Sequence, residues 1–206
     1  PPVEHFNAQK LKQFIAAGKT LVDLRDASSF GGAHVPGSIN IGFSPQVANW
    51  LGVVVDPEEE LVILGATESD IDEALLQFRR AGYDRIVGYV IGIAEWVAQG
   101  EETGILPQLS VHGLQKLLTH DEHTVIDVRT DQEWRAGHIK GAQHIPIQQI
   151  IENSLDVGKE EDMSIICGSG YRSNIAGSFL KAQGFTKINS VIGGMNAWNR
   201  KYEVEK

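Results

Sequence analysis

The feature that most constrains this chain is an internal repeat. Residues 21–41 align with residues 125–145 at an offset of 104, and residues 62–86 align with residues 164–188 at an offset of 102. The identical pairs of the first block are Asp23 and Asp127, Arg25 and Arg129, His34 and His138, Gly37 and Gly141, and Ile41 and Ile145. A register held over tens of residues indicates that one structural unit occurs twice.

The two copies meet in a stretch with the composition of a linker. Residues 100–108 read GEETGILPQ and combine Gly, Pro and charge. We therefore predict two domains, residues 1–103 and residues 104–206, each of a typical domain size. A chain of 206 residues that is 42% hydrophobic can bury a core in each of them.

Both copies alternate strands with helices. In each copy a predicted helix (7–17; 110–119) precedes an apolar strand that ends in Asp-x-Arg. A loop, a second strand, a second helix (70–81; 173–183) and a short strand follow. This alternation predicts an α/β fold, with an open, mostly parallel sheet covered by helices on both faces in each domain. Ligand sites of such sheets lie where a strand leads into a helix.

The strand-to-helix loop of the second copy carries the strongest chemical signal. It reads Cys167-Gly-Ser-Gly-Tyr-Arg172-Ser. Its glycines let consecutive backbone N–H groups point inward, and the following helix adds its positive end. With Arg172, this field favours the thiolate of Cys167 and would bind an anion or stabilise a persulfide. We predict Cys167 and Arg172 as catalytic, with Gly168, Ser169, Gly170, Tyr171 and Ser173 as substrate-binding residues.

Several of these residues also have structural interpretations. A lone cysteine at a strand end is commonly a small buried hydrophobe. Ser169 and Ser173 are equally suited to hydrogen bond the sulfur and to cap the following helix. Asp127 and Arg129 end a strand near the predicted site. We interpret them as an internal ion pair that supports the site.

The corresponding loop of the first copy lacks the residues needed for this chemistry. Gly65 stands where the second copy has Cys167, and Asp70 stands in place of Arg172. Glu68 and Asp72 add negative charge, which would repel an anion. Residues 1–103 contain 7 basic and 15 acidic side chains, whereas residues 104–206 contain 11 and 12. We therefore predict that the first domain is catalytically silent. Because its Asp23, Arg25 and His34 persist without that chemistry, the repeat favours structural roles for Asp127, Arg129 and His138.

The composition excludes several classes of function. A net charge of −9 argues against binding to nucleic acid or to anionic membranes. One cysteine excludes an intrachain disulfide and favours the cytoplasm. The histidines show no zinc-ligand spacing, so we expect no metal site and no cofactor besides a covalent cysteine persulfide. We also expect no membrane span, and the start at Pro1 without an initiator Met is typical of a portion of a longer chain.

Taken together, these motifs resemble the rhodanese (sulfurtransferase) family, in tandem over nearly the whole chain. The resemblance rests on Asp127-Val-Arg129, Glu133-Trp134, Gly137-His138-Ile139, Gly141-Ala142, the loop from Cys167 to Arg172, and Gly193-Gly194 with Trp198. It implies that Cys167 takes a sulfane sulfur from thiosulfate or a low-molecular-weight persulfide. The sulfur would then pass from a Cys167 persulfide to cyanide, sulfite or a thiol. It also implies an inactive N-terminal domain beside an active C-terminal one.

A narrower resemblance concerns the first copy. It looks like the middle domain of fusions in which a metallo-β-lactamase-fold persulfide dioxygenase precedes two rhodanese domains. The cues are residues 43–57 and the segments Gly82-Tyr83-Asp84 and Gly88-Tyr89. This resemblance implies an N-terminal dioxygenase domain as a partner that this sequence does not include.

Two other classes of function remain open from the sequence. One is a non-catalytic interaction module, for which the silent copy is suited. The other is a cysteine phosphatase, although four residues separate Cys167 from Arg172 here and the phosphatase pattern has one more. The donor is open as well: Arg172 favours a small anion, whereas Tyr171 could pack against a larger thiol.

Overall fold

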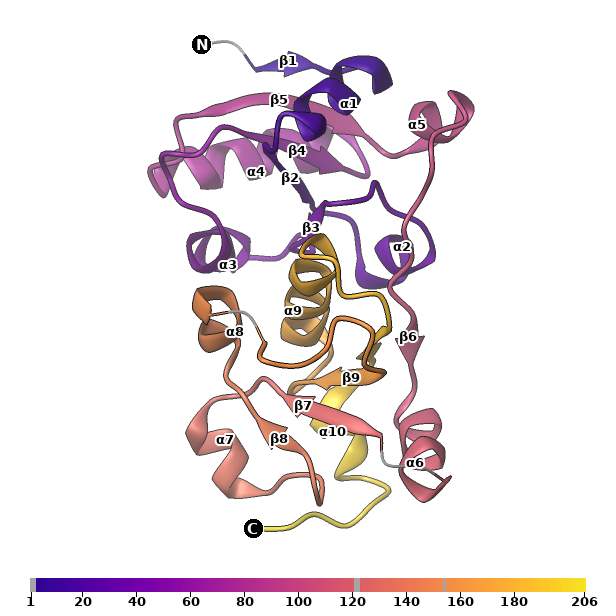
Figure 1. Cartoon of the computed structure of the whole chain (residues 1–206). Coiled ribbons are helices and arrows are strands. Elements are labelled where there is room, and N and C mark those ends of the chain that lie inside the picture. Colours follow the sequence, from indigo (N-terminus) through magenta and orange to yellow (C-terminus); the bar gives the residue numbers. More distant parts are fainter. Residues whose placement is uncertain (1–2, 121–122, 154) are drawn as a thin grey trace. The chain divides into compact units, whose positions relative to one another are not determined.

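The computed structural model describes residues 3–120, 123–153 and 155–206 (Figure 1). The chain divides into two compact units, Pro1–Ile105 and Leu106–Lys206. Each unit contains a five-stranded sheet, and every pair of neighbouring strands in it is parallel. The predicted α/β fold, with two similar domains in tandem, is confirmed.

The first unit has the strand order β1-β5-β4-β2-β3. Its elements are β1 (Glu4–His5), α1 (Ala8–Ala16), β2 (Thr20–Asp23), α2 (Ala27–Gly32), β3 (Ile39–Asn40), α3 (Val47–Val54), β4 (Leu61–Gly65), α4 (Glu68–Arg80), β5 (Ile86–Ile91) and α5 (Ala94–Ala98). All five residues of the central strand β4 are buried. A parallel sheet with helices on both faces requires such an apolar central strand.

The second unit repeats this arrangement with the order β6-β10-β9-β7-β8. Its elements are β6 (Gln108–Leu109), α6 (Val111–His120), β7 (Thr124–Asp127), α7 (Asp131–Ala136), β8 (Gln143–His144), α8 (Ile147–Asn153), β9 (Met163–Ile166), α9 (Tyr171–Ala182), β10 (Ile188–Val191) and α10 (Gly194–Trp198). Here β9 takes the central place, and all of its residues are buried.

Equivalent apolar clusters cover one face of each sheet. In the first unit, Leu11 of α1 and Trp96 of α5 pack with Val62 and Leu64 of β4. In the second unit, Leu114 of α6 and Trp198 of α10 pack with Ile166 of β9. Trp96 and Trp198 are 7% and 3% exposed, which confirms the prediction that both are core anchors. In the first unit, α4 packs against both β4 and α3.

The structure differs from the predicted elements in several respects, which include the added helices α3 and α8 and strands β1 and β6. Helices α4 and α9 begin at Glu68 and Tyr171, two residues before the predicted starts. The loop predicted after Asp-x-Arg contains a short helix in both units, α2 and α7. For α7 the sequence carried a usable signal, because Thr130 and Glu133 form a capping box at its start.

The pairing register of β5 with β4 differs by one residue from the register of β10 with β9. The pairing of β4 with β5 is irregular at Leu61/Val62, so that Tyr89 lies opposite Ile63. In the second unit Ser190 lies opposite Ile165. Because Ile63 and Ile165 are equivalent in the repeat, Tyr89 and Ser190 occupy equivalent places. The residue offset between the copies is therefore 101 at Tyr89 of β5 and Ser190 of β10, one less than the offset between β4 and β9.

Candidate active site

Cys167 lies directly after β9, at the carboxyl end of the central strand of the second sheet. Four residues later the chain enters α9, a helix of 12 residues. The sulfur therefore lies at a strand-to-helix turn, the usual place for a ligand site in a parallel sheet. The Cys167 side chain is buried, with 0% of its surface exposed.

The backbone of the loop turns toward the sulfur. The Gly170 N–H donates a hydrogen bond to Cys167 Sγ at 3.1 Å. Gly170 has a φ of 104°, and a Cβ atom on it would lie 3.3 Å from both the Gly193 nitrogen and the Val191 carbonyl oxygen. Only glycine fits this conformation without strain. Gly170 is also the N-cap of α9, so the positive end of the helix lies at this loop.

The sulfur contacts one serine hydroxyl group, which contacts a second. Cys167 Sγ is 3.7 Å from Ser173 Oγ, and Ser173 Oγ is 3.1 Å from Ser190 Oγ. Ser173 also donates to the Gly170 carbonyl oxygen at 3.0 Å, whereas Ser169 is exposed. No side chain caps α9, so the capping interpretation of Ser169 and Ser173 is wrong. The contact with sulfur holds for Ser173, and Ser190 is a neighbour that the sequence had not indicated.

Arg172 is paired with a carboxylate. Its Nη1 and Nη2 donate to Glu133 Oε2 and Oε1 at 2.7 and 2.6 Å. Hydrogen bonds from Arg172 lower the pKa of Glu133 to about 2, so the carboxylate is ionised near neutral pH. The sequence pattern does not predict a role for Glu133 in the site. The sequence contains one signal that could have identified Glu133, namely an acidic residue on the short helix that follows Asp-x-Arg.

Asp127 and Arg129 form a buried ion pair, as expected, with 2.7 Å between Arg129 Nη2 and Asp127 Oδ2. Arg129 Nη2 also donates to the Gly137 carbonyl oxygen at 2.8 Å, which ties the end of β7 to the loop after α7. In the first unit Arg25 binds Asp23 in the same way and donates to the Ala33 carbonyl oxygen. The repeated geometry supports a structural role, because the first unit has no cysteine.

The repeated histidines also have equivalent environments. The His34 ring stacks on Phe30 with 3.9 Å between centroids, and His138 stacks on Trp134 with 3.6 Å. His34 Nδ1 contacts the Phe30 carbonyl oxygen, and His138 Nδ1 contacts that of Trp134. These contacts fit the predicted role of both histidines as structural loop residues. Among the described residues, no group of three or more His, Cys, Asp or Glu side chains could hold a metal ion.

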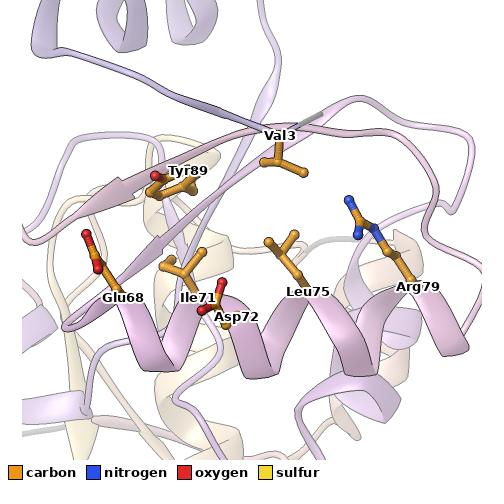
Figure 2. Close-up of a pocket in the computed structure, with 7 residues that line it drawn as sticks. All are labelled: Val3, Glu68, Ile71, Asp72, Leu75, Arg79 and Tyr89. Carbon is orange, nitrogen blue, oxygen red and sulfur yellow. The ribbon is translucent and has the colours of Figure 1, made fainter. Parts of the chain in front are cut away.

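In the first unit, the place of the sulfur is filled. A Cβ atom on Gly65 would lie 2.9 Å from Ile71 Cδ1, and Ile71 is the counterpart of Ser173. Asp70 accepts a hydrogen bond from the Thr67 N–H in the capping box of α4. Beside this loop a pocket of about 380 Å³ opens between α4 and β5 (Figure 2). Its lining residues are Val3, Glu68, Ile71, Asp72, Leu75, Arg79 and Tyr89.

Comparison with known proteins identifies the family. The model of the Rhodanese-like domain family matches residues 7–99 and again residues 110–201. The chain belongs to the rhodanese family. It contains two rhodanese-like domains in tandem, as the resemblance implied, and the unit with Cys167 is the second.

Relatives of this rhodanese chain include proteins named as sulfurtransferases. It is 32% identical to the thiosulfate sulfurtransferase GlpE of Pseudomonas putida over 81 residues, which are 39% of this chain and 74% of GlpE. It is 33% identical to the YrkF protein of Bacillus subtilis over 104 residues, or 50% of this chain. That match spans 56% of the length of YrkF.

Among solved structures, a rhodanese-like domain protein from Staphylococcus aureus is 32% identical, with a TM-score of 0.45. The alignment covers 48% of this chain and 97% of that protein. In the part of our chain that the structure describes, no helix has the length and apolar character needed to cross a membrane.

Proposed function

We propose that this rhodanese is a sulfurtransferase that carries a sulfane sulfur as a persulfide on Cys167. The observation that carries the proposal is the position of Cys167 Sγ. It lies at the carboxyl end of the central strand, accepts the Gly170 N–H and adjoins the N-terminus of α9. Backbone N–H groups and a helix N-terminus stabilise an anionic sulfur. The named relatives support the same class of reaction.

The proposed reaction has two steps and needs no external oxidant or reductant. The Cys167 thiolate attacks the outer sulfur of thiosulfate, the S–S bond of thiosulfate breaks, and sulfite leaves with the bonding electron pair. The persulfide anion that remains on Cys167 accepts the Gly170 N–H in place of the thiolate. Cyanide then attacks the outer sulfur, thiocyanate leaves, and the thiolate is restored. A low-molecular-weight persulfide as donor would release its thiol instead of sulfite.

The acceptor must come from outside the chain. Cys167 is the only cysteine in the sequence, so no second internal thiol can take up the sulfur. Sulfite, cyanide and thiols are nucleophiles that can attack the outer sulfur of a persulfide. We therefore propose a small thiophilic acceptor, or a partner protein that supplies a thiol.

Intact mass spectrometry tests this proposal. After treatment with thiosulfate or glutathione persulfide, we expect a mass gain of one sulfur atom that cyanide removes. The Cys167→Ser variant should show no such gain. If no donor loads the protein, or if Cys167→Ser carries the same adduct, the proposal is wrong.

The burial of Cys167 favours one alternative, a non-catalytic interaction module. A cysteine with 0% exposure can be a packing residue. Alkylation by iodoacetamide at neutral pH separates the two functions, because a catalytic thiolate reacts and a packing thiol does not. An inert Cys167 that also fails to load sulfur would favour the interaction module.

Two finer predictions extend beyond the described units. We propose that the chain occurs together with a metallo-β-lactamase-fold persulfide dioxygenase, which would link it to persulfide substrates. We also propose a cytoplasmic setting, since a single free thiol suits a reducing compartment. The DNA that flanks the coding segment tests the first proposal, and cell fractionation tests the second.

A further inference from the structure

The Glu133 carboxylate binds both terminal nitrogens of Arg172. Arg172 is the one arginine in the segment from Cys167 to Ser173, called the sulfur loop below. Nη1 and Nη2 of Arg172 each donate to a different oxygen of the Glu133 carboxylate, at 2.7 and 2.6 Å. This bidentate geometry is the strongest that an arginine and a carboxylate can form. An anionic substrate would therefore meet a guanidinium whose charge is balanced by a carboxylate and two of whose five N–H donors are bound to it.

The carboxylate is held in place from its own helix. Thr130 N–H and Thr130 Oγ1 both donate to Glu133 Oε2, at 3.0 and 2.9 Å. Glu133 N–H donates back to Thr130 Oγ1, which completes the capping box of α7. Glu133 is thus fixed between the start of α7 and Arg172. Movement of Glu133 away from Arg172 would break these bonds as well.

The ion pair lies against the residue that follows the nucleophile. A Cβ atom on Gly168 would lie 3.1 Å from Arg172 Nη2 and 3.6 Å from Glu133 Oε1. The negative carboxylate is therefore close to the backbone from which the sulfur loop is built. A charged donor that approaches Cys167 along this side of the loop would interact electrostatically with Glu133 as well as with Arg172.

The first unit lacks both members of this pair. Ser29 is the counterpart of Glu133 and donates to Asp26 of its own helix at 2.6 Å. Asp70 is the counterpart of Arg172 and caps α4. The ion pair is therefore specific to the unit with the cysteine, unlike the Asp-Arg pairs that occur in both units.

We propose that Glu133 determines donor specificity by neutralising Arg172, so that the site selects low-molecular-weight persulfides over the dianion thiosulfate. This inference rests on the sulfurtransferase function proposed above. Thiosulfate brings two negative charges to a loop in which the Glu133 carboxylate offsets the positive charge of Arg172. The reacting end of a persulfide is neutral or carries one negative charge, so the Glu133 carboxylate repels it less. Glu133 acts through Arg172 and is a positioning residue for it.

The test compares two donors in three proteins. Rates of sulfur transfer to cyanide are measured with thiosulfate and with glutathione persulfide for the wild type, Glu133→Gln and Asp131→Asn. Glutamine keeps an oxygen that can accept in the capping box, so the fold is retained. In Glu133→Gln the ratio of kcat/KM for thiosulfate to that for glutathione persulfide should rise about tenfold, mainly through a lower KM for thiosulfate.

Asp131→Asn is the matched control, because it removes one negative charge from the same helix. The Asp131 side chain is 69% exposed and does not contact Arg172, so its donor ratio should change less than about twofold. Rates with thiosulfate should also fall more steeply with added salt in Glu133→Gln than in the wild type, because the freed Arg172 then attracts the dianion.

The outcomes separate this inference from the proposed function. If the wild type transfers sulfur but Glu133→Gln leaves the donor ratio unchanged, the specificity role is wrong and the sulfurtransferase function stands. The same conclusion follows if Asp131→Asn shifts the ratio as much as Glu133→Gln, since bulk charge then explains the effect. If the wild type accepts sulfur from neither donor, the proposed function is wrong and the inference falls with it.

Discussion

The loops after β4 and β9 place very different side chains on the same backbone plan. Each follows the central strand of a five-stranded parallel sheet and leads into a long helix. One loop carries Cys167 with an ion-paired Arg172, and the other carries Gly65 and Asp70. The fold supplies the strand-to-helix turn in both units. The chemistry depends on which side chains occupy it.

The two units also differ in the residues that pack against the loop after the central strand. In the second unit the sulfur contacts the Ser173 hydroxyl group, which in turn contacts the Ser190 hydroxyl group. Their counterparts in the first unit are Ile71 and Tyr89, which line the pocket shown in Figure 2. Ile71 has no polar atom at the place where Ser173 contacts the sulfur. The first unit thus lacks this hydroxyl group as well as the nucleophile.

Removal of the nucleophile should have the largest effect. Cys167→Ser is expected to lower the rate of sulfur transfer from thiosulfate to cyanide by about a thousandfold or more, because no other thiol can form the persulfide. Stopped-flow or steady-state detection of thiocyanate measures the rate. Residual transfer within about tenfold of the wild type would contradict the assignment of Cys167.

The Asp23–Arg25 and Asp127–Arg129 pairs should contribute equally to the stability of their units, whereas only the Asp127–Arg129 pair should affect sulfur transfer. Asp127→Asn and Asp23→Asn each leave a buried arginine without its partner, which typically costs about 3–5 kcal/mol. Hydrogen exchange followed by mass spectrometry should show faster exchange of β7 and β9 amides in Asp127→Asn, and of β2 and β4 amides in Asp23→Asn. Sulfur loading should fall in Asp127→Asn alone. Loss of loading in Asp23→Asn to the same extent would contradict this division.

Much of the fold and part of the site could be predicted from the sequence. The repeat and the order of elements led to the parallel sheets, and the glycines around Cys167 led to the curled loop, now seen at Gly170. The Arg172–Glu133 pair could not be derived, because its members are 39 residues apart and their contact depends on tertiary structure. Ser190 was missed for the same reason. The short strands β1 and β6 have two residues each, too few for a periodic signal.

Introduction of a cysteine into the first unit should fail to create a second site. A Cβ atom at position 65 would lie 2.9 Å from Ile71 Cδ1, so Gly65→Cys must displace that side chain. Overpacking of this kind costs about 1–3 kcal/mol. In a Cys167→Ser background we expect Gly65→Cys to lower the denaturant midpoint and to load no sulfur that cyanide removes.

A double variant, Gly65→Cys with Ile71→Ser, sharpens this experiment. The smaller serine removes the steric conflict, although loss of the buried Ile71 side chain should itself cost about 2–5 kcal/mol of stability. Sulfur loading should still be absent, since Asp70 and Glu68 remain at the loop. If the single variant loads sulfur efficiently, the first unit lacks only a nucleophile, and its other residues do not prevent sulfur loading.

The two serines of the sulfur loop should differ in importance. Ser173 is buried, and its Oγ accepts from Cys167 Sγ at 3.7 Å and donates to the Gly170 carbonyl oxygen, so Ser173→Ala should slow sulfur transfer about tenfold by removing bonds that hold the loop around the sulfur. Ser169 is exposed, and Ser169→Ala should change the rate less than about twofold. Steady-state rates with a single donor check both values. Equal effects of the two substitutions would show that the hydroxyl at 173 does not act on the sulfur.

The smallest expected effect is an acid sensitivity that the Glu133–Arg172 pair confers on the second unit. Hydrogen bonds from Arg172 lower the pKa of Glu133 from 4.5 to about 2. A carboxyl group with a lowered pKa in the folded state stabilises that state above its ordinary pKa, and the contribution is lost as the pH falls from 4.5 toward 2. Because the Glu133 side chain is 37% exposed, solvent screening keeps the contribution small.

Glu133→Gln removes this titration and keeps the capping box. Across the interval from pH 4.5 to 2, its denaturant midpoint should therefore fall less than that of the wild type. The first unit has Ser29 at this position, so the substitution should leave hydrogen exchange of β2 and β4 unchanged at every pH. Parallel midpoint curves for the two proteins would show that Arg172 does not hold Glu133 in solution. The charge balance on which the donor preference depends would then be absent.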